Sequence, residues 1–191
     1  DVYLNTRVID VKCSDSKILS VKAIQTTTEK EFEFTGEMFM DATGDGFVGY
    51  KAGALYTYGR EAKETYNEPH ALDVADNNTM GNSIMFTTKD MGHPIVFRKP
   101  SWAYSYSEND LKDRDHSHID SGYWWLEVSG NYNTIDDSEE IRDELLKVLY
   151  GVWDHIKNGG NHGAANYALD WIGSIPGKRE SRRFYGDYVL N

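Results

Sequence analysis

The sequence has 191 residues, of which 39% are hydrophobic and 13% aromatic, so it carries enough apolar surface for one sizeable core or two small ones. Its 20 Lys and Arg residues stand against 31 Asp and Glu, and the net charge of −11 repels phosphate backbones, which argues against nucleic acid as a partner. No apolar run approaches the roughly 20 residues that cross a bilayer, and the single Cys13 excludes an internal disulfide framework.

The N-terminal part predicts a β-meander. Short runs of β-branched and aromatic residues, separated by polar turns at 14–17 and 26–30, indicate antiparallel strands. One more buried strand is expected at 38–40, and the residues from Phe47 onward suit a short helix. The order is therefore meander, strand, glycine turn and helix.

The middle of the sequence is less regular. Residues 56–82 are polar without a clear period, and we interpret them as an excursion from the core. Three further strands are expected where aromatic and β-branched side chains gather, at 83–87, 95–97 and 123–128.

The clearest element is a long helix over 138–158, whose apolar residues recur every three or four positions. Asp137 and Glu140 have the spacing of a capping box, and a pair of glycines follows the last turn. A second helix is expected over 164–171, and a final strand over 184–190.

The glycine turn at residues 44–49, Gly-Asp-Gly-Phe-Val-Gly, satisfies the G-x-G-x-x-G pattern between a strand and a helix, where phosphates commonly bind. Two features differ from an opening dinucleotide-binding unit. Glu37 and Asp41 interrupt the strand, and the helix is too short for a full crossover. A tight turn without a ligand is the alternative.

Residues 39–46, Phe-Met-Asp-Ala-Thr-Gly-Asp-Gly, resemble the second flavin motif of the two-dinucleotide-binding-domain flavoproteins, which also follows a meander. The resemblance implies that FAD is the cofactor. It also implies that Thr43, Gly44, Asp45 and Gly46 contact the flavin.

A second segment, residues 177–183, reads Gly-Lys-Arg-Glu-Ser-Arg-Arg and resembles a segment of the FAD-dependent oxidoreductase family, often found in bacterial genomes. The similarity extends through 123–127 and 151–158. It implies hydride transfer between a small organic substrate and the flavin. Arg179 and Arg182 would orient the substrate or stabilise negative charge, because a guanidinium fork suits carboxylate and phosphate. A solvated basic turn paired with nearby acids is the alternative interpretation.

Two histidines, His116 and His118, have the spacing that places both rings on one face of a strand. Zinc needs three or four placed ligands, and no cysteine or distant histidine partner is evident from the sequence. We therefore interpret this segment as a polar loop and predict no metal site. His155 is expected to be a half-buried histidine of the long helix.

Together these features predict an α+β chain in two parts, a meander and flavin-facing turn at 1–55 and a mixed substrate-side lobe with a helical pair at 56–191. The opening fingerprint of such enzymes lies outside this sequence, so we expect the isolated chain to be inactive. The alternative function is a non-enzymatic module that binds carbohydrate or protein through its aromatic segments. Compartment, oligomeric state and substrate identity do not follow from the residues, which contain no targeting signal.

Overall fold

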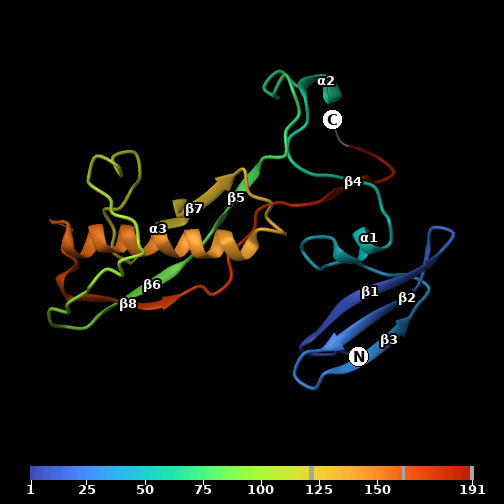
Figure 1. Ribbon diagram of the computed structural model, residues 1–191, viewed down its shortest axis with the longest axis horizontal. Helices are drawn as coiled ribbons and strands as arrows, with labels where there is room; N and C mark the ends of the chain where they lie inside the picture. Colours follow the sequence, from blue (N-terminus) through green and yellow to red (C-terminus); the bar gives the residue numbers. More distant parts are fainter. Residues whose placement is uncertain (121–122, 161, 190–191) are drawn as a thin grey trace. The chain divides into compact units, whose positions relative to one another are not determined.

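The computed structural model describes residues 1–120, 123–160 and 162–189, and it divides the chain into two compact units. One unit comprises Asp1–Ala75 together with Glu180–Asn191, and the other comprises Asp76–Arg179. The division expected near residue 55, between the flavin-facing turn and the substrate-side lobe, is a functional one and stays a prediction. Figure 1 shows the elements of each unit in chain order.

The first unit is built on an antiparallel meander, as predicted. Strands β1 (Thr6–Ser14), β2 (Lys17–Gln25) and β3 (Lys30–Thr35) form one sheet in that order. The β1–β2 hairpin turns through Asp15 and Ser16, both with positive φ, which is the twist that a two-residue hairpin loop requires. Apolar residues at alternate positions of β2 and β3 share one face of the sheet, because strand side chains have a period of two.

The buried strand predicted at 38–40 is wrong. Met38 and Met40 are each 92% exposed, and none of the described residues pairs with this segment. A strand needs a neighbouring strand for its hydrogen bonds, and the composition of a short apolar run does not reveal whether that neighbour exists. The prediction rested on composition alone.

The glycine turn leads into α1 (Phe47–Lys51), the short helix expected after it. The chain then forms β4 (Tyr56–Thr57) and α2 (Lys63–Tyr66) within the predicted excursion. Strand β4 pairs antiparallel with β9 (Arg183–Phe184), so the end of the chain returns to the segment that follows α1.

The second unit contains two antiparallel strand pairs. Strand β5 (Thr79–Ser83) pairs with β7 (Glu127–Gly130), and β6 (Phe86–Asp90) pairs with β8 (Tyr167–Ile172). Short 3-10 turns, η1 (Tyr123–Trp125) and η2 (Ala164–Asn166), precede β7 and β8. Each pair therefore joins a strand from the start of the unit to one that lies much later in the sequence.

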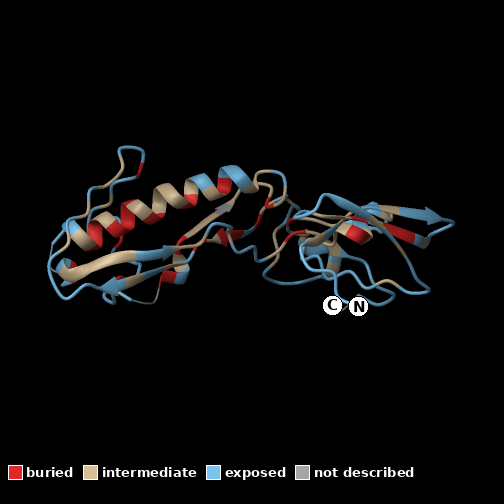
Figure 2. Ribbon diagram, turned by 90° about the horizontal axis from the view of Figure 1, so that it is seen from below, coloured by how far each residue is buried: buried red, intermediate tan, exposed pale blue. Residues whose placement is uncertain are grey.

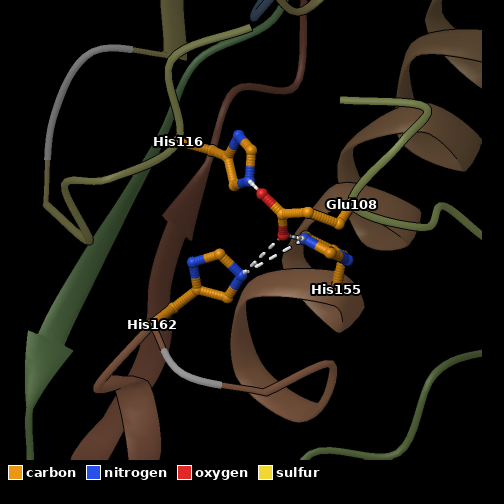
Figure 3. A group of neighbouring side chains, drawn as sticks. All are labelled: Glu108, His116, His155 and His162. Carbon is orange, nitrogen blue, oxygen red and sulfur yellow. Dashed lines mark hydrogen bonds and ion pairs between the residues drawn. The ribbon is translucent and has the colours of Figure 1, made fainter. Parts of the chain in front are cut away.

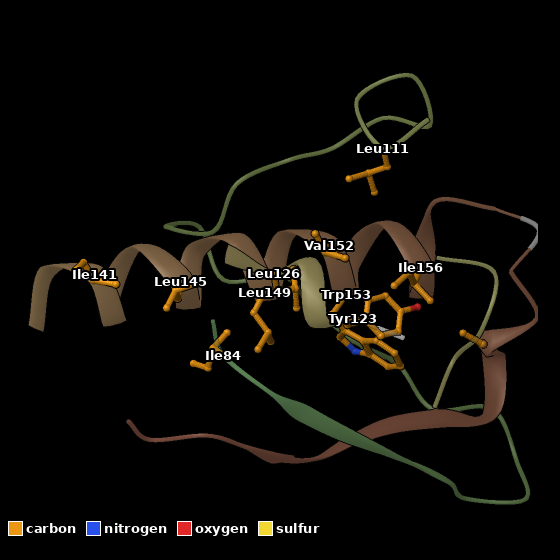
Figure 4. Close-up of a cluster of buried hydrophobic side chains, with 11 residues drawn as sticks. Ile84, Leu111, Tyr123, Leu126, Ile141, Leu145, Leu149, Val152, Trp153 and Ile156 are labelled. Carbon is orange, nitrogen blue, oxygen red and sulfur yellow. The ribbon is translucent and has the colours of Figure 1, made fainter. Parts of the chain in front are cut away.

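A single long helix, α3 (Ser138–Asn158), organises the core of this unit and has the predicted bounds. Figure 2 shows buried residues repeating along one side of α3. Figure 4 shows that Leu145, Leu149 and Trp153 extend from the helix toward the strands. Burial of each fully enclosed Leu or Ile contributes roughly 1.5–3 kcal/mol. The enclosed residues of α3 are Ile141, Leu145, Leu149, Val152, Trp153 and Ile156.

The second helix predicted at 164–171 is wrong, and with it the helical pair. After one 3-10 turn this segment forms β8, whose Tyr167 and Leu169 pack against the core. An irregularity in the pairing after Leu169 leaves Trp171 exposed and places Ile172 against the core. Pairing with β6 outweighs the helix propensity of the intervening alanines, since tertiary context overrides a weak local preference.

Other local predictions need correction. Asp137 makes no capping bond through its side chain, which instead accepts a hydrogen bond from the backbone N–H of Asn133 at 2.8 Å. The described residues 95–97 form no strand. Residues 123–125 are a 3-10 turn rather than strand. Of the final strand predicted at 184–190, Phe184 pairs with β4, and residue 190 lies outside the described residues.

The protein is an α+β chain, with strands in both units and one long helix. None of the described helices has the length and apolarity needed to cross a bilayer.

Candidate functional site

The turn that begins at Asp41 is held by its own side chains. The Asp41 carboxylate accepts hydrogen bonds from the backbone N–H of Thr43 at 3.0 Å, from the Thr43 hydroxyl at 2.7 Å and from the backbone N–H of Gly49 at 2.9 Å. The Thr43 oxygen accepts in turn from the N–H of Phe47 at 2.8 Å. Asp41 and Thr43 therefore satisfy the first amides of α1, which would otherwise lack partners.

These contacts lower the pKa of Asp41. Partial burial acts in the opposite direction and is the largest single influence. The hydrogen bonds from Gly49 and Thr43 together outweigh it and favour the ionised carboxylate. The turn is thus built around a fixed negative charge.

Two glycines shape the turn in different ways. Gly44 has φ of +86°, and a Cβ at this position would meet no atom within 4 Å, so its backbone faces open space. Gly46 has φ of +65°, and a Cβ there would lie 2.1 Å from a ring carbon of Phe184. Gly44 leaves room beside the backbone, whereas Gly46 permits the β9 aromatic ring to pack against the turn.

The second predicted segment reaches the same turn. The hydroxyl of buried Ser181 donates to Asp45 Oδ1 at 2.9 Å, and Arg182 Nη1 donates to the Asp45 carbonyl oxygen at 3.0 Å. The two motifs that the sequence suggested separately are joined at Asp45.

Arg182 is a half-buried cation held by aromatic rings. Its guanidinium lies 4.0 Å from the ring centroid of Tyr50 and 5.7 Å from that of Tyr56. Within the described part of the chain it forms no ion pair with a carboxylate. Its orientation is thus fixed while its charge remains uncompensated, an arrangement suited to an anion.

The neighbouring arginines differ from Arg182. Arg183 donates to the Gly59 carbonyl at 2.7 Å and forms ion pairs with Glu61 and Glu180, at 3.1 and 3.5 Å, so its charge is already matched. Arg179 is exposed and, among the residues described, makes no hydrogen bond or ion pair.

A hollow of about 360 Å³ opens beside this turn. That volume is at the small end of the range for ligand sites. Arg182 supplies a positive charge, Gly44 a bare stretch of backbone and Phe184 an apolar wall. The hollow is lined by Asp41, Ala42, Gly44, Gly46, Arg182 and Phe184.

The residues present fit part of an anionic, planar cofactor such as FAD. An uncompensated guanidinium suits a phosphate or another electron-rich oxygen, and a glycine with open space beside it allows close approach. Asp41 also lines the hollow and is ionised, but three hydrogen bonds direct its oxygens to Thr43 and Gly49, so its negative charge is partly offset within the turn.

The site residues predicted from sequence are thus only partly brought together. The hollow is lined by Gly44, Gly46 and Arg182. Asp45 does not line it but accepts a hydrogen bond from Arg182, and Thr43 caps α1. The sequence did not suggest Phe184 or Tyr50 as contributors. An aromatic residue two positions after an arginine carries no signal of its own, because only the return of β9 to β4 places it.

The structure also corrects the interpretation of the histidines in the second unit. His116 lies beside His155, His162 and Glu108 rather than in an isolated polar loop, whereas His118 stays exposed outside this group. His162 and Glu108 were missed because the cluster joins two parts of the sequence, and 47 positions separate Glu108 from His155.

Comparison with known proteins supports one family. The family model described as FAD dependent oxidoreductase matches residues 1–191. Neither the curated proteins nor the solved structures include a significant match to this sequence.

Proposed function

Because the chain belongs to the FAD dependent oxidoreductase family, we propose that it forms part of an enzyme that transfers hydride between a small organic substrate and FAD, with the Arg182 hollow facing the cofactor. The cofactor is assigned to this hollow because the charge of Arg182, which has no ion-pair partner among the described residues, lies beside the open backbone of Gly44. When bound, the flavin supplies the redox chemistry, and the protein supplies position and electrostatics.

Each predicted site residue has a distinct part in this proposal. Gly44 allows the cofactor to approach the backbone, and Gly46 makes room for the Phe184 ring that lines the hollow. Thr43 and Asp45 keep the turn in the required shape. Arg182 places a positive charge beside the electron-rich part of the cofactor or an anionic substrate. Arg179, exposed and without an ion pair among the described residues, is assigned to orientation of the substrate.

The isolated chain is proposed to be inactive. Its hollow is small, and the described residues lining it come from one turn and the start of the returning strand. So small a surface makes few contacts with a ligand. Their free energy does not offset the translational and rotational entropy that the ligand loses on binding. Stoichiometric, tightly bound flavin in the isolated chain would contradict this part of the proposal.

The family match does not favour the carbohydrate- or protein-binding alternative. Strand β9 pairs with β4 and not with the meander, so the sheet topology favours neither function. The aromatic segments divide between core and surface. Tyr106, Tyr123 and Trp125 pack in or against the core, whereas Trp102, Tyr104 and Trp124 are exposed.

The test compares Arg182→Gln with Arg7→Gln in the full-length protein. Arg7 is an exposed residue of β1 with no hydrogen bond or ion pair among the described residues, so its replacement matches the loss of charge. Since a charge-assisted hydrogen bond contributes about 1.5–3 kcal/mol, we expect Arg182→Gln to weaken flavin binding about 10- to 100-fold. The flavin dissociation constant, followed by fluorescence, is the measurement. Equal affinity in the two variants would remove Arg182 from the cofactor site.

A further inference from the structure

Four side chains that could ligate a metal ion converge in the second unit. Glu108 and His116 come from the segment between β6 and β7, His155 from the last turns of α3, and His162 from the segment after that helix. Each offers one ligand atom, and all four atoms lie within 4.8 Å of one another. Figure 3 shows the Glu108 carboxylate between the ring of His116 on one side and the rings of His155 and His162 on the other.

The three rings are sheltered while the carboxylate is open to solvent. The side chains of His116, His155 and His162 are 8%, 4% and 15% exposed, whereas that of Glu108 is 71% exposed. The site is therefore a set of buried nitrogen atoms with a single accessible side, through which an ion can enter.

Backbone carbonyls fix the orientation of two rings. His116 Nδ1 lies 2.6 Å from the carbonyl oxygen of Arg114, and His155 Nδ1 lies 3.2 Å from that of Tyr106. Because a carbonyl oxygen only accepts, both Nδ1 atoms carry hydrogen. The Nε2 atoms are then the free ligand positions, and this is the usual second contact of metal-binding histidines.

The inward-facing atoms form a group of acceptors without enough donors. His155 Nε2 lies 3.2 Å from both His162 Nε2 and Glu108 Oε2, and His116 Nε2 lies 3.3 Å from Glu108 Oε1. With hydrogen on Nδ1, the neutral rings of His116 and His155 direct bare Nε2 atoms at the oxygens of Glu108, so acceptors face acceptors. One bound cation would satisfy all four ligand atoms with the rings neutral.

The spacing fits a small tetrahedral ion. With metal–ligand bonds of about 2.0–2.1 Å, tetrahedral zinc holds its ligand atoms about 3.3 Å apart. The contacts of His155 and His162 with Glu108 Oε2 and with each other range from 3.2 to 3.7 Å. His116 contacts the other oxygen, Oε1, at 3.3 Å, and the four ligand atoms span up to 4.8 Å, so a bound ion draws His116 toward the other three ligands. Nitrogen ligands favour zinc over magnesium or calcium, which prefer oxygen. We propose that His116, His155, His162 and Glu108 bind one Zn²⁺ ion.

The position of the cluster gives the ion a structural role. Residues 91–120 contain no helix or strand, an unusual length of irregular chain within a compact unit. Glu108 and His116 belong to this segment, while His155 belongs to the helix that forms the core. Zinc joins the irregular segment to the C-terminal end of α3 and to the turn at His162.

The experiment uses the full-length protein, prepared without a polyhistidine tag, stripped with a chelator and reloaded with Zn²⁺. Zinc retained after desalting is measured by elemental mass spectrometry. We expect one zinc ion per chain in the wild type and in His118→Gln, the matched control from the same segment. His162→Gln is expected to bind zinc at least about 10-fold more weakly.

Glu108→Gln keeps the proposal testable if a histidine variant fails to fold, because Glu108 is exposed. It too is expected to weaken zinc binding, with an unchanged circular dichroism spectrum. X-ray absorption at the zinc edge should show only nitrogen and oxygen ligands, as expected for three imidazoles and a carboxylate. A folded wild type that takes up no Zn²⁺, or equal zinc affinity in His162→Gln and His118→Gln, would overturn the proposal.

Discussion

The guanidinium of Arg182 donates a hydrogen bond to the backbone carbonyl of Asp45 over 3.0 Å, although the two residues are 137 positions apart. Ser181 reinforces the contact through the Asp45 side chain. The glycine turn and the arginine-rich segment therefore form one structure. This junction places a positive charge at the edge of the hollow that we assign to the flavin.

Replacing Asp41 with Asn should destabilise the glycine turn in a pH-dependent way. Hydrogen bonds lower the pKa of Asp41 in the folded protein, so the native state releases its proton more readily than the unfolded state does. This stabilisation is present above the unfolded pKa of about 3.9. It is lost as the pH falls through the lower, folded pKa.

For Asp41→Asn we expect a loss of about 1 kcal/mol near pH 7, because the carboxylate is largely exposed and solvent screens it. The difference from wild type should vanish at pH values below the folded pKa. Urea unfolding at a series of pH values measures it. Asp73→Asn is the control, since Asp73 is exposed and makes no hydrogen bond among the described residues. A cost for Asp41→Asn that is the same at every pH would contradict this explanation.

The contact between Gly46 and Phe184 predicts a strong effect of a single methyl group. In Gly46→Ala the new Cβ would lie 2.1 Å from the Phe184 ring, in addition to the strain of a positive φ. We expect a loss of about 2–4 kcal/mol. Adding Phe184→Leu should recover part of it, because a smaller side chain can move away.

Gly53→Ala is the control that separates the backbone strain of a positive φ from the steric overlap with Phe184. Gly53 has φ of +81°, and a Cβ at this position would meet no atom within 4 Å, so only the backbone strain of about 1 kcal/mol applies. Thermal denaturation of the three variants provides the comparison. The packing argument fails if Gly46→Ala loses no more stability than Gly53→Ala.

At Gly151, in the middle of α3, we expect alanine to destabilise the helix, although it usually stabilises a helix relative to glycine. Alanine normally stabilises an exposed helix interior by about 1 kcal/mol relative to glycine. A Cβ at Gly151 would instead lie 2.6 Å from the backbone oxygen of Tyr104, so Gly151→Ala should destabilise by about 1–3 kcal/mol.

Glu140→Ala is the control for this helix, because Glu140 is exposed in its first turn and the expected capping box is absent. We expect a change within about 0.5 kcal/mol. Melting temperatures measure both substitutions. A stabilising Gly151→Ala would show that the segment carrying Tyr104 does not pack closely against α3.

Elements specified by local pattern were predictable. The apolar spacing along α3 and the paired turns of the meander each depend on residues close in sequence, and both elements formed as expected. The second helix failed because Tyr167, Leu169 and Trp171 also fit a strand, and only the presence of β6 decides between the two. Local pattern cannot supply that partner.

The candidate sites were likewise predictable only where they depend on residues close in sequence. The glycine turn and Arg182 were recognised through motif resemblance, but their meeting at Asp45 depends on the pairing of β9 with β4. The histidine cluster was missed because His116 and His155 approach only when the irregular segment packs on α3. Spacing rules detect ligands that are neighbours in sequence, whereas these four come from three separate segments.

The most direct test of the flavin-facing hollow is the visible absorption spectrum of the full-length protein, compared between Gly44→Leu and Gly53→Leu. Both glycines have positive φ and open surroundings, so each substitution should cost about 1–2 kcal/mol of stability. Of the two, Gly44 alone lines the hollow. The proposal predicts flavin bands in the wild type and Gly53→Leu that are weakened or lost in Gly44→Leu. A colourless, folded wild type that takes up no added FAD, or equal flavin content in the two variants, would contradict it.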